Sequence, residues 1–190
     1  KSVKENGALL DEIVQMFQRR AMDVAACVAP TKVFFNYERP SGPTSSIPTI
    51  GSFKEYVELF SAPAAAPVEG AATSGDAVQG ASAESGPASR QIAYANVNDR
   101  WEVAVGLSST GNFENMSFVN NVWTVRGGTH VTLVAAQVTK AIEQVLAKKN
   151  AATTSAAIRN KMMVFVNCKI ENPMFEGQTK GRLNSKPAVF

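Results

Sequence analysis

Apolar residues recur at the three- and four-residue spacing of an amphipathic helix in two stretches of the chain. Residues 8–28 carry one such stripe, made of Leu10, Ile13, Val14, Phe17, Ala21, Val24, Ala25 and Val28. The second stripe follows Thr129 and is made of Val131, Val134, Ala135, Val138, Ile142 and Val145. The first pattern predicts a helix that Pro30 ends, and the second predicts a helix with Thr129 as its N-cap. A short third helix is predicted over 53–60, "FKEYVELF".

Apolar residues at every second position, which share one face of an extended chain, predict strands elsewhere. "TKVFFNY" (31–37), "RWEVAVGLS" (100–108), "NFENMSFVNNV" (112–122) and "MMVFVNCKI" (162–170) show this pattern. The turn signal "SSTGN" joins the second and third of these runs, so we expect them to pair as a hairpin. If the strands on either side of the second long helix are parallel neighbours, they form a crossover unit. Strands that pair in this way, with helices on one face, predict an α+β domain.

The composition changes abruptly at residues 61–89. Ala, Gly, Ser and Pro fill 22 of these 29 positions, and none is aromatic. Such a segment buries too little apolar surface to offset its ordering entropy, which predicts a disordered insertion within one domain. The chain is therefore divided into residues 1–60, the insert 61–89 and a core of 90–190.

Composition and charge exclude several classes of protein. No apolar run approaches 18 residues, so no membrane span is expected. The cysteines, Cys27 and Cys168, are too few for a disulfide framework and are interpreted as core residues of a reducing compartment. With His130 as the single histidine, no zinc site is expected. The 190 residues suit one domain, and the start at Lys1 without Met suggests a piece of a longer protein.

Three polar groups are candidates for binding an anion. "RGGTH" (126–130) places two glycines before a helix, which suits either an anion-binding loop or a tight turn that only glycine makes. Lys148 and Lys149 end the same helix and either complement its dipole or contact nucleic-acid phosphates. Residues 140–190 contain nine Lys or Arg against three Glu, which favours an anionic partner slightly.

The third group is "QTK", which consists of Gln178, Thr179 and Lys180, beyond the end of the last strand. Lysine is a common phosphate ligand, and the Gln178 amide is a hydrogen-bond donor. A lysine at a loop tip beyond a rigid strand could be delivered into a site on another domain. The alternative is an ordinary solvated turn.

Five motifs in order resemble the transducer domain of eukaryotic type IIA DNA topoisomerases. They are the "WEV" strand, the "SFVN" strand, the "GGTHV" helix start, the tail "FVNCKIENPMFEGQTK" and the final "PAVF". The resemblance covers the chain except 61–89. It implies a ribosomal-S5-domain-2-like α+β fold with a mixed or antiparallel sheet backed by helices.

The resemblance also implies a function. The transducer follows a GHKL ATPase domain and carries a QTK loop into its ATP pocket, so Gln178, Thr179 and Lys180 are the expected ATP-binding residues and Lys180 the expected catalytic one. Upstream ATPase domains dimerise on ATP and close over double-stranded DNA, and a cleavage core lies downstream. Lys148 and Lys149 match two positions of the family's DNA-facing lysine tripeptide, with Ala147 at the first.

The remaining expectations concern the parent enzyme. It would be a homodimeric isomerase of the nucleus, or alternatively of an organellar genome, and would use ATP with Mg²⁺ held mainly by other domains. The 190 residues alone would neither hydrolyse ATP nor cut DNA. Two alternatives stay open: a stand-alone S5-like nucleic-acid-binding module, and a subunit of bacterial gyrase.

Overall fold

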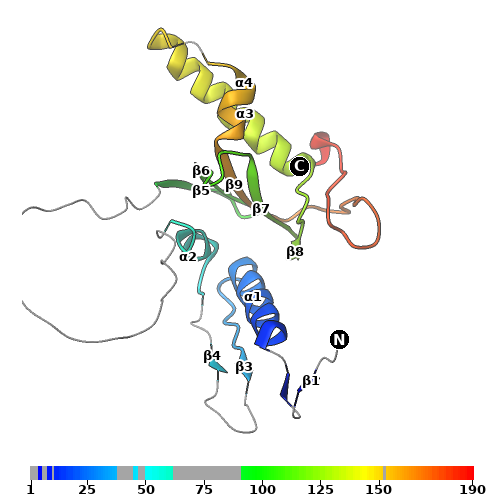
Figure 1. Cartoon of the computed structure of the whole chain (residues 1–190). Helices are drawn as coiled ribbons and strands as arrows, with labels where there is room; N and C mark the ends of the chain where they lie inside the picture. The colour runs from blue at the N-terminus through cyan, green and yellow to red at the C-terminus, as the bar shows by residue number, and fades with distance from the viewer. Residues whose placement is uncertain are drawn as a thin grey trace, which may run out of the picture.

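In the computed structural model, residues 4–5, 8–9, 11–37, 45–46, 50–61, 91–151 and 153–190 are described. The predicted insert therefore lies outside the described residues, except for Ser61. The centre of the fold is a five-stranded sheet in the order β5-β6-β9-β7-β8 (Figure 1). Its strands are β5 (Ile92–Asn98), β6 (Trp101–Leu107), β7 (Glu114–Val119), β8 (Val122–Trp123) and β9 (Met162–Cys168).

The central strand is β9, which runs antiparallel to β6 and parallel to β7. Six of its seven residues are buried, and they include neighbours that point to opposite faces, such as Val164 and Phe165. A strand with two buried faces is stable only inside a sheet that is covered on both sides. This requirement explains the nearly continuous apolar run "MMVFV".

The predicted hairpin between the strands at 100–108 and 112–122 is wrong, because β9 lies between β6 and β7. The segment "SSTGN", which connects β6 to β7, therefore passes the Met162 end of β9. The sheet has two other hairpins, β5–β6 and β7–β8. Asn120 and Asn121 form the β7–β8 turn with φ of 50° and 64°, and this left-handed pair is typical of two-residue hairpin loops. The conditional crossover is present, because β7 and β9 are parallel neighbours.

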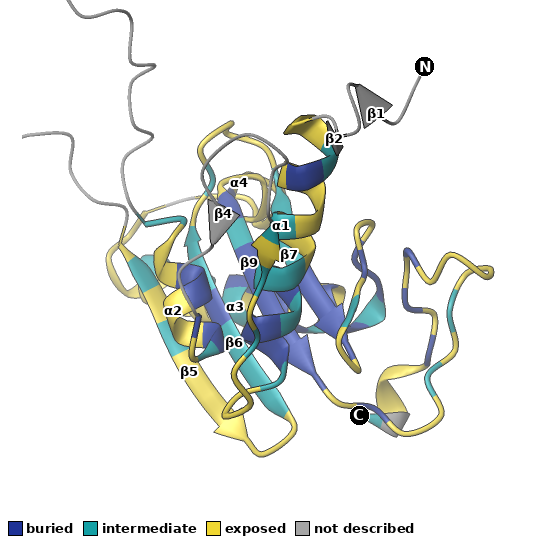
Figure 2. Ribbon diagram, turned by 90° about the horizontal axis from the view of Figure 1, so that it is seen from below, coloured by how far each residue is buried: buried dark blue, intermediate teal, exposed yellow. Residues whose placement is uncertain are grey.

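Helices cover both faces of the sheet, whereas the sequence predicted them on one (Figures 1 and 2). On one face, α3 (Thr129–Lys148) and α4 (Ser155–Asn160) pack on Val164, Val166 and Cys168 of β9. On the other, α1 (Asp11–Cys27) and α2 (Phe53–Glu58) pack on Ala104, Phe118 and Phe165. Because β9 side chains alternate between the faces, one strand contributes to both cores.

The remaining elements are short. The predicted helices at 8–28 and 53–60 are present as α1 and α2, and Ser52 caps α2 by accepting a 3.2 Å hydrogen bond from the Glu55 amide. The sequence missed α4. Of the strand predicted at 31–37, only β3 (Asn36–Tyr37) forms, paired with β4 (Ser45–Ser46). The others are β1 (Lys4–Glu5), β2 (Ala8–Leu9) and a 3₁₀ turn, η1 (Pro187–Val189). Among the described helices, none has the length and apolar character of a bilayer span.

Candidate functional site

Gln178, Thr179 and Lys180 lie together at the tip of a hairpin-like loop beyond β9. Phe175 and Leu183 form an antiparallel bridge at its base. Above the bridge, the Glu176 amide donates to the Arg182 carbonyl at 2.9 Å. The Lys180 amide then donates to the Gly177 carbonyl at 3.3 Å, which closes a four-residue turn. The three polar side chains are exposed at this turn, so their reach is limited only by their own length.

Lys180 has an unusual conformation within the turn. Its φ is 54°, in the left-handed region that residues other than glycine seldom occupy. Its Nζ lies 5.8 Å from the centroid of the Phe175 ring, within the range of a cation–π contact. In the described part of the chain, its ammonium group forms no ion pair with a carboxylate. The charge is therefore held near the loop's own aromatic ring and is open to an anion.

The base of the loop is bonded to the segment before α3. The Arg126 amide donates to the Gly181 carbonyl at 2.8 Å, and the Leu183 amide donates to the Gly127 carbonyl at 3.0 Å. The Thr129 amide donates to the Leu183 carbonyl at 3.2 Å. Leu183 itself is fully buried in the core beneath α3. We call these three hydrogen bonds the loop clasp.

The second glycine of "RGGTH" permits the close approach of this segment to Leu183. Gly128 has φ 144°, and a Cβ placed on it would lie 2.4 Å from the Leu183 carbonyl oxygen. No side chain fits at that distance, so the tight-turn interpretation is supported. The amides of Arg126, Gly127 and Thr129 all donate within the chain, which leaves them unavailable to an anion.

Thr129 is not the N-cap that the sequence predicted. Gly128 occupies the cap position, Thr129 is the first helical residue, and the buried Thr129 hydroxyl has no hydrogen-bond partner. The cap moves because the Thr129 amide is needed by Leu183, and the glycine provides the backbone angle that this requires. The cap preference of threonine is worth about 1 kcal/mol, which tertiary contacts override.

His130 is a buried structural residue. Its Nε2 lies 3.2 Å from the Thr124 hydroxyl, which is itself 2.7 Å from the Ser117 hydroxyl, while its Nδ1 has no partner. Burial lowers the pKa of His130 to about 4, so the ring is neutral at pH 7. A neutral, fully enclosed imidazole does not contact a solvent-borne substrate.

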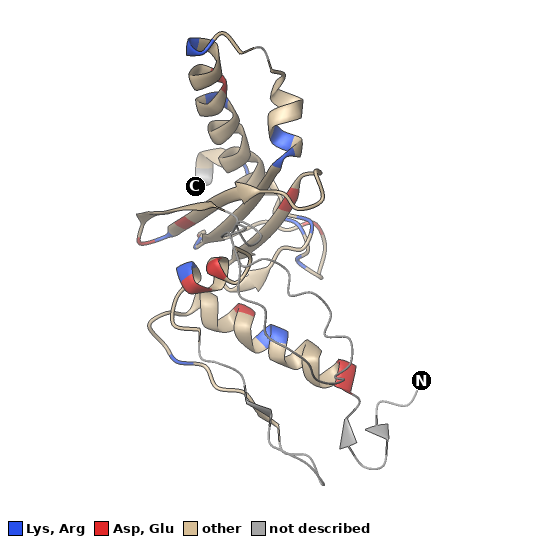
Figure 3. Cartoon of the chain, turned by 60° about the vertical axis from the view of Figure 1, so that its left-hand side comes forward, with Lys and Arg blue, Asp and Glu red and all other residues tan. Residues whose placement is uncertain are grey.

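Lys148 and Lys149 lie at the opposite end of α3 from the loop clasp (Figure 3). Both side chains are exposed, and Asn150 ends the helix with φ 54°. The 20 residues of α3 span about 30 Å at 1.5 Å per residue. The structure therefore does not bring the two lysines to the QTK turn: they lie at one end of α3, and the base of the QTK loop is bonded to the other end.

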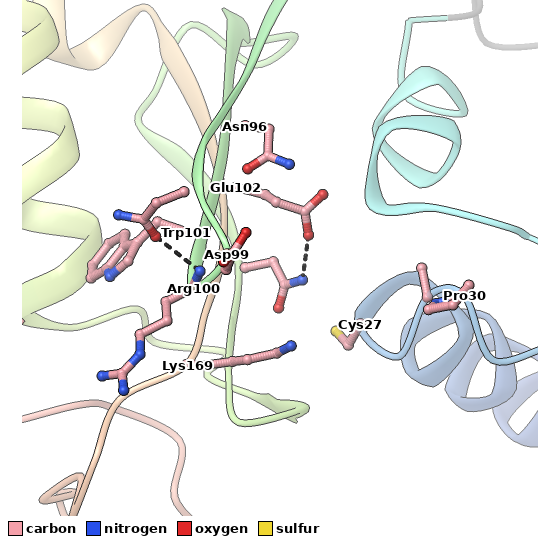
Figure 4. A pocket seen from close by; sticks show the side chains of 11 residues that line it. Cys27, Pro30, Asn96, Asp99, Arg100, Trp101, Glu102 and Lys169 are labelled. Atoms are coloured by element: carbon pink, nitrogen blue, oxygen red, sulfur yellow. Dashed lines mark hydrogen bonds between the residues drawn. The ribbon is translucent and has the colours of Figure 1, made fainter.

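A cavity that the sequence did not reveal lies between the end of α1 and the sheet (Figure 4). Its volume is about 340 Å³, and its lining includes Cys27, Asn96, Asp99, Arg100, Glu102 and Lys169. Two of the four charged side chains, Arg100 and Glu102, are bonded within the chain. Arg100 pairs with Glu171, and Glu102 accepts hydrogen bonds from Tyr94 and Asn167. Burial raises the pKa of the Cys27 thiol to about 12, which suppresses its nucleophilic form.

The described residues contain no cluster of three or more His, Cys, Asp or Glu that could hold a metal ion. The exposed QTK turn suits an anion better, because it presents an ammonium, an amide and a hydroxyl together. Phosphate oxygens are natural acceptors for these donors. A phosphate that approached from outside the described residues would meet Lys180 without displacing a carboxylate partner.

Comparison with known proteins places the chain in a family. The sequence model described as DNA gyrase B matches residues 52–189. A probable DNA topoisomerase 2 of Dictyostelium discoideum is 37% identical over 183 residues, which is 95% of this chain and 10% of the relative. DNA topoisomerase 2 of Bombyx mori is 36% identical over 96% of this chain and 10% of its own length. The chain thus spans about a tenth of these relatives.

Solved structures agree with the sequence comparison. The ATPase region of Saccharomyces cerevisiae topoisomerase II matches with a TM-score of 0.68 at 32% identity, covering 96% of this chain and 38% of that one. The ATPase and transducer domains of DNA topoisomerase II from Balamuthia mandrillaris match with a TM-score of 0.68 at 32% identity, covering 96% and 39%. The α+β fold expected from the sequence is confirmed. The chain belongs to the DNA gyrase B family and is similar to eukaryotic DNA topoisomerase 2 proteins.

Proposed function

We propose that the chain is the transducer of an ATP-dependent type II DNA topoisomerase, an isomerase, and that its QTK turn senses the γ-phosphate of ATP. The observation that carries this proposal is the exposed turn Gly177–Lys180, held at the end of a braced hairpin. Membership of the DNA gyrase B family supports it and disfavours a stand-alone nucleic-acid-binding module. A bacterial gyrase subunit is also disfavoured, because gyrase B of Thermus thermophilus is only 22% identical.

Lys180 would act on the phosphate electrostatically. The γ-phosphate carries concentrated negative charge, and more charge develops on the bridging oxygen as the bond breaks. An ammonium group placed there stabilises the transition state, and the Gln178 amide and Thr179 hydroxyl add hydrogen bonds that orient it. ATP supplies the phosphoryl group for hydrolysis. As the family resemblance implies, Mg²⁺ would be held mainly by other domains.

Helix α3 is suited to link nucleotide state with DNA. Its start is bonded to the base of the QTK loop, and its end carries Lys148 and Lys149 about 30 Å away. In this proposal a GHKL domain upstream binds the nucleotide, and a cleavage core of the same chain lies downstream. The enzyme works as a homodimer that closes over a DNA duplex. Release of phosphate would free the turn, so that the transducer changes its orientation.

The test is ATP turnover by the parent enzyme with Lys180→Ala. We expect kcat to fall about tenfold or more, and each tenfold corresponds to about 1.4 kcal/mol of lost transition-state stabilisation. Lys186→Ala is the matched control, because Lys186 is an exposed lysine beyond the turn. Equal turnover of the two variants would disprove a role for Lys180 at the phosphate.

The proposed compartment is the nucleus, with an organellar genome as the alternative. A fluorescent fusion of the parent protein would distinguish the two by its overlap with nuclear or organellar DNA. The division of the chain into 1–60, the insert 61–89 and 90–190 also stays a prediction.

A further inference from the structure

We propose that the loop clasp positions Lys180, so that Gly128 and Leu183 are positioning residues for the QTK turn. This inference rests on the proposed phosphate-sensing function. The clasp joins segments 55 residues apart, because Leu183 bonds on one side to Gly127 and on the other to Thr129. The peptide of Gly128 is thereby enclosed against the backbone of Leu183.

Only two residues separate Leu183 from Lys180, and both are held. The Gly181 carbonyl accepts from the Arg126 amide at 2.8 Å, and the Arg182 carbonyl accepts from the Glu176 amide at 2.9 Å. Each residue between Lys180 and Leu183 therefore has its carbonyl held by a backbone hydrogen bond. A change in the position of Leu183 would move the base of the turn as a unit.

The arm of the loop that precedes the turn is braced as well. The Met174 carbonyl accepts from the Asn184 amide at 2.7 Å, and its amide donates to the Ser185 hydroxyl at 2.8 Å. Ser185 is buried, so this bond is shielded from water. At the rim, Arg126 pairs with Glu176 at 3.5 Å, although both side chains are about half exposed. The rigid part of the loop thus ends just below the turn Gly177–Lys180.

A comparison of three glycines with positive φ distinguishes the effect of a steric clash from the effect of backbone strain alone. A Cβ on Gly128 would meet three atoms of Leu183 at 2.4, 2.6 and 2.8 Å. Gly111, at 73°, and Gly177, at 77°, would meet nothing within 4 Å. Gly111 lies between β6 and β7, and Gly177 lies in the turn itself. Alanine at Gly111 therefore introduces strain alone, at a remote place.

The experiment uses the full parent enzyme. We expect Gly128→Ala to lower kcat for ATP about tenfold and to change KM less than about twofold, because most contacts to the nucleotide are proposed to lie in another domain. Gly111→Ala should leave both constants unchanged. Leu183→Ala keeps the backbone atoms of the clasp and instead removes the buried side chain that anchors Leu183 in the core beneath α3. It provides the measurement if Gly128→Ala does not fold.

Adding Lys180→Ala to each clasp variant separates positioning from general destabilisation. If the clasp acts through Lys180, the double variant turns over ATP no more slowly than Lys180→Ala alone. If the two losses multiply, or if both clasp variants retain wild-type kcat, the inference is overturned.

A second readout does not depend on turnover. Trypsin cuts after Lys180 and Arg182, and we expect faster cleavage there in Gly128→Ala or Leu183→Ala than in Gly111→Ala. Unchanged turnover in Lys180→Ala would refute the proposed phosphate contact, while this cleavage still shows whether the clasp holds the turn. Equal cleavage in all variants would overturn the clasp itself.

Discussion

The Tyr56 hydroxyl donates a 2.7 Å hydrogen bond to Oδ1 of Asp23, an acid that is only 2% exposed. Arg19 completes the group, with Nε 3.0 Å from the same oxygen and Nη2 2.8 Å from the tyrosine hydroxyl. Burial and the hydrogen bond to Asp23 raise the pKa of Tyr56, so its hydroxyl stays a donor at ordinary pH. This buried polar group joins α1 to α2.

Replacing Tyr56 with Phe should therefore destabilise the chain. The change removes one of two donors to a buried carboxylate and should cost about 1–3 kcal/mol in the free energy of unfolding, measured by urea titration. Tyr94→Phe is the control, because the Tyr94 hydroxyl also bonds a carboxylate, Glu102, in a more exposed place. A smaller loss for Tyr56→Phe than for Tyr94→Phe would contradict the importance of the buried group.

His130 should make stability depend on pH. Its pKa is about 4 in the folded chain and 6.5 when exposed, so between these values the unfolded chain binds more protons. The free energy of unfolding should hold its full value above pH 6.5 and lose about 3 kcal/mol as the pH falls to 4. His130→Gln should show a flatter profile over this window. Parallel profiles would mean that His130 does not titrate in this way.

Both cysteines should be unreactive in the folded chain. Burial raises the pKa of Cys27 and of Cys168 to about 12, and neither is in a disulfide. Because the thiolate is the reactive form, a chromogenic disulfide reagent at pH 8 should react slowly with native protein. It should find both thiols after denaturation. Rapid reaction of a thiol in the native protein, abolished by Cys27→Ser, would show that the cavity beside α1 opens.

Lys148 and Lys149 should contribute to DNA binding through phosphates. In the parent enzyme, Lys148→Ala with Lys149→Ala should flatten the plot of log affinity for duplex DNA against log salt by up to about 2 in slope. DNA-stimulated ATP turnover should become less sensitive to salt in the same variant. Lys32→Ala with Lys54→Ala removes two exposed charges elsewhere and is the control. An unchanged slope would rule out the contact.

Local patterns in the sequence predicted much of the secondary structure. The stripe at 8–28 became α1, the stripe after Thr129 became α3, and the run at 162–170 became a buried strand. These elements follow from residues close in sequence, since the helical and extended patterns relate residues only two to four positions apart. The resemblance that singled out Gln178 and Lys180 also rests on local motifs. The structure confirms that these residues share one exposed turn, while their contact with ATP stays a prediction.

Contacts between distant residues were decided only by the tertiary structure. The insertion of β9 between β6 and β7 depends on which strand buries both faces, and a turn signal such as "SSTGN" carries no information about that choice. The place of Asp23 inside an apolar helix face makes sense only beside Tyr56. Likewise, "RGGTH" is explained by the backbone of Leu183. Local propensities of about 1 kcal/mol set the elements, but long-range packing, worth several times more, chose their partners.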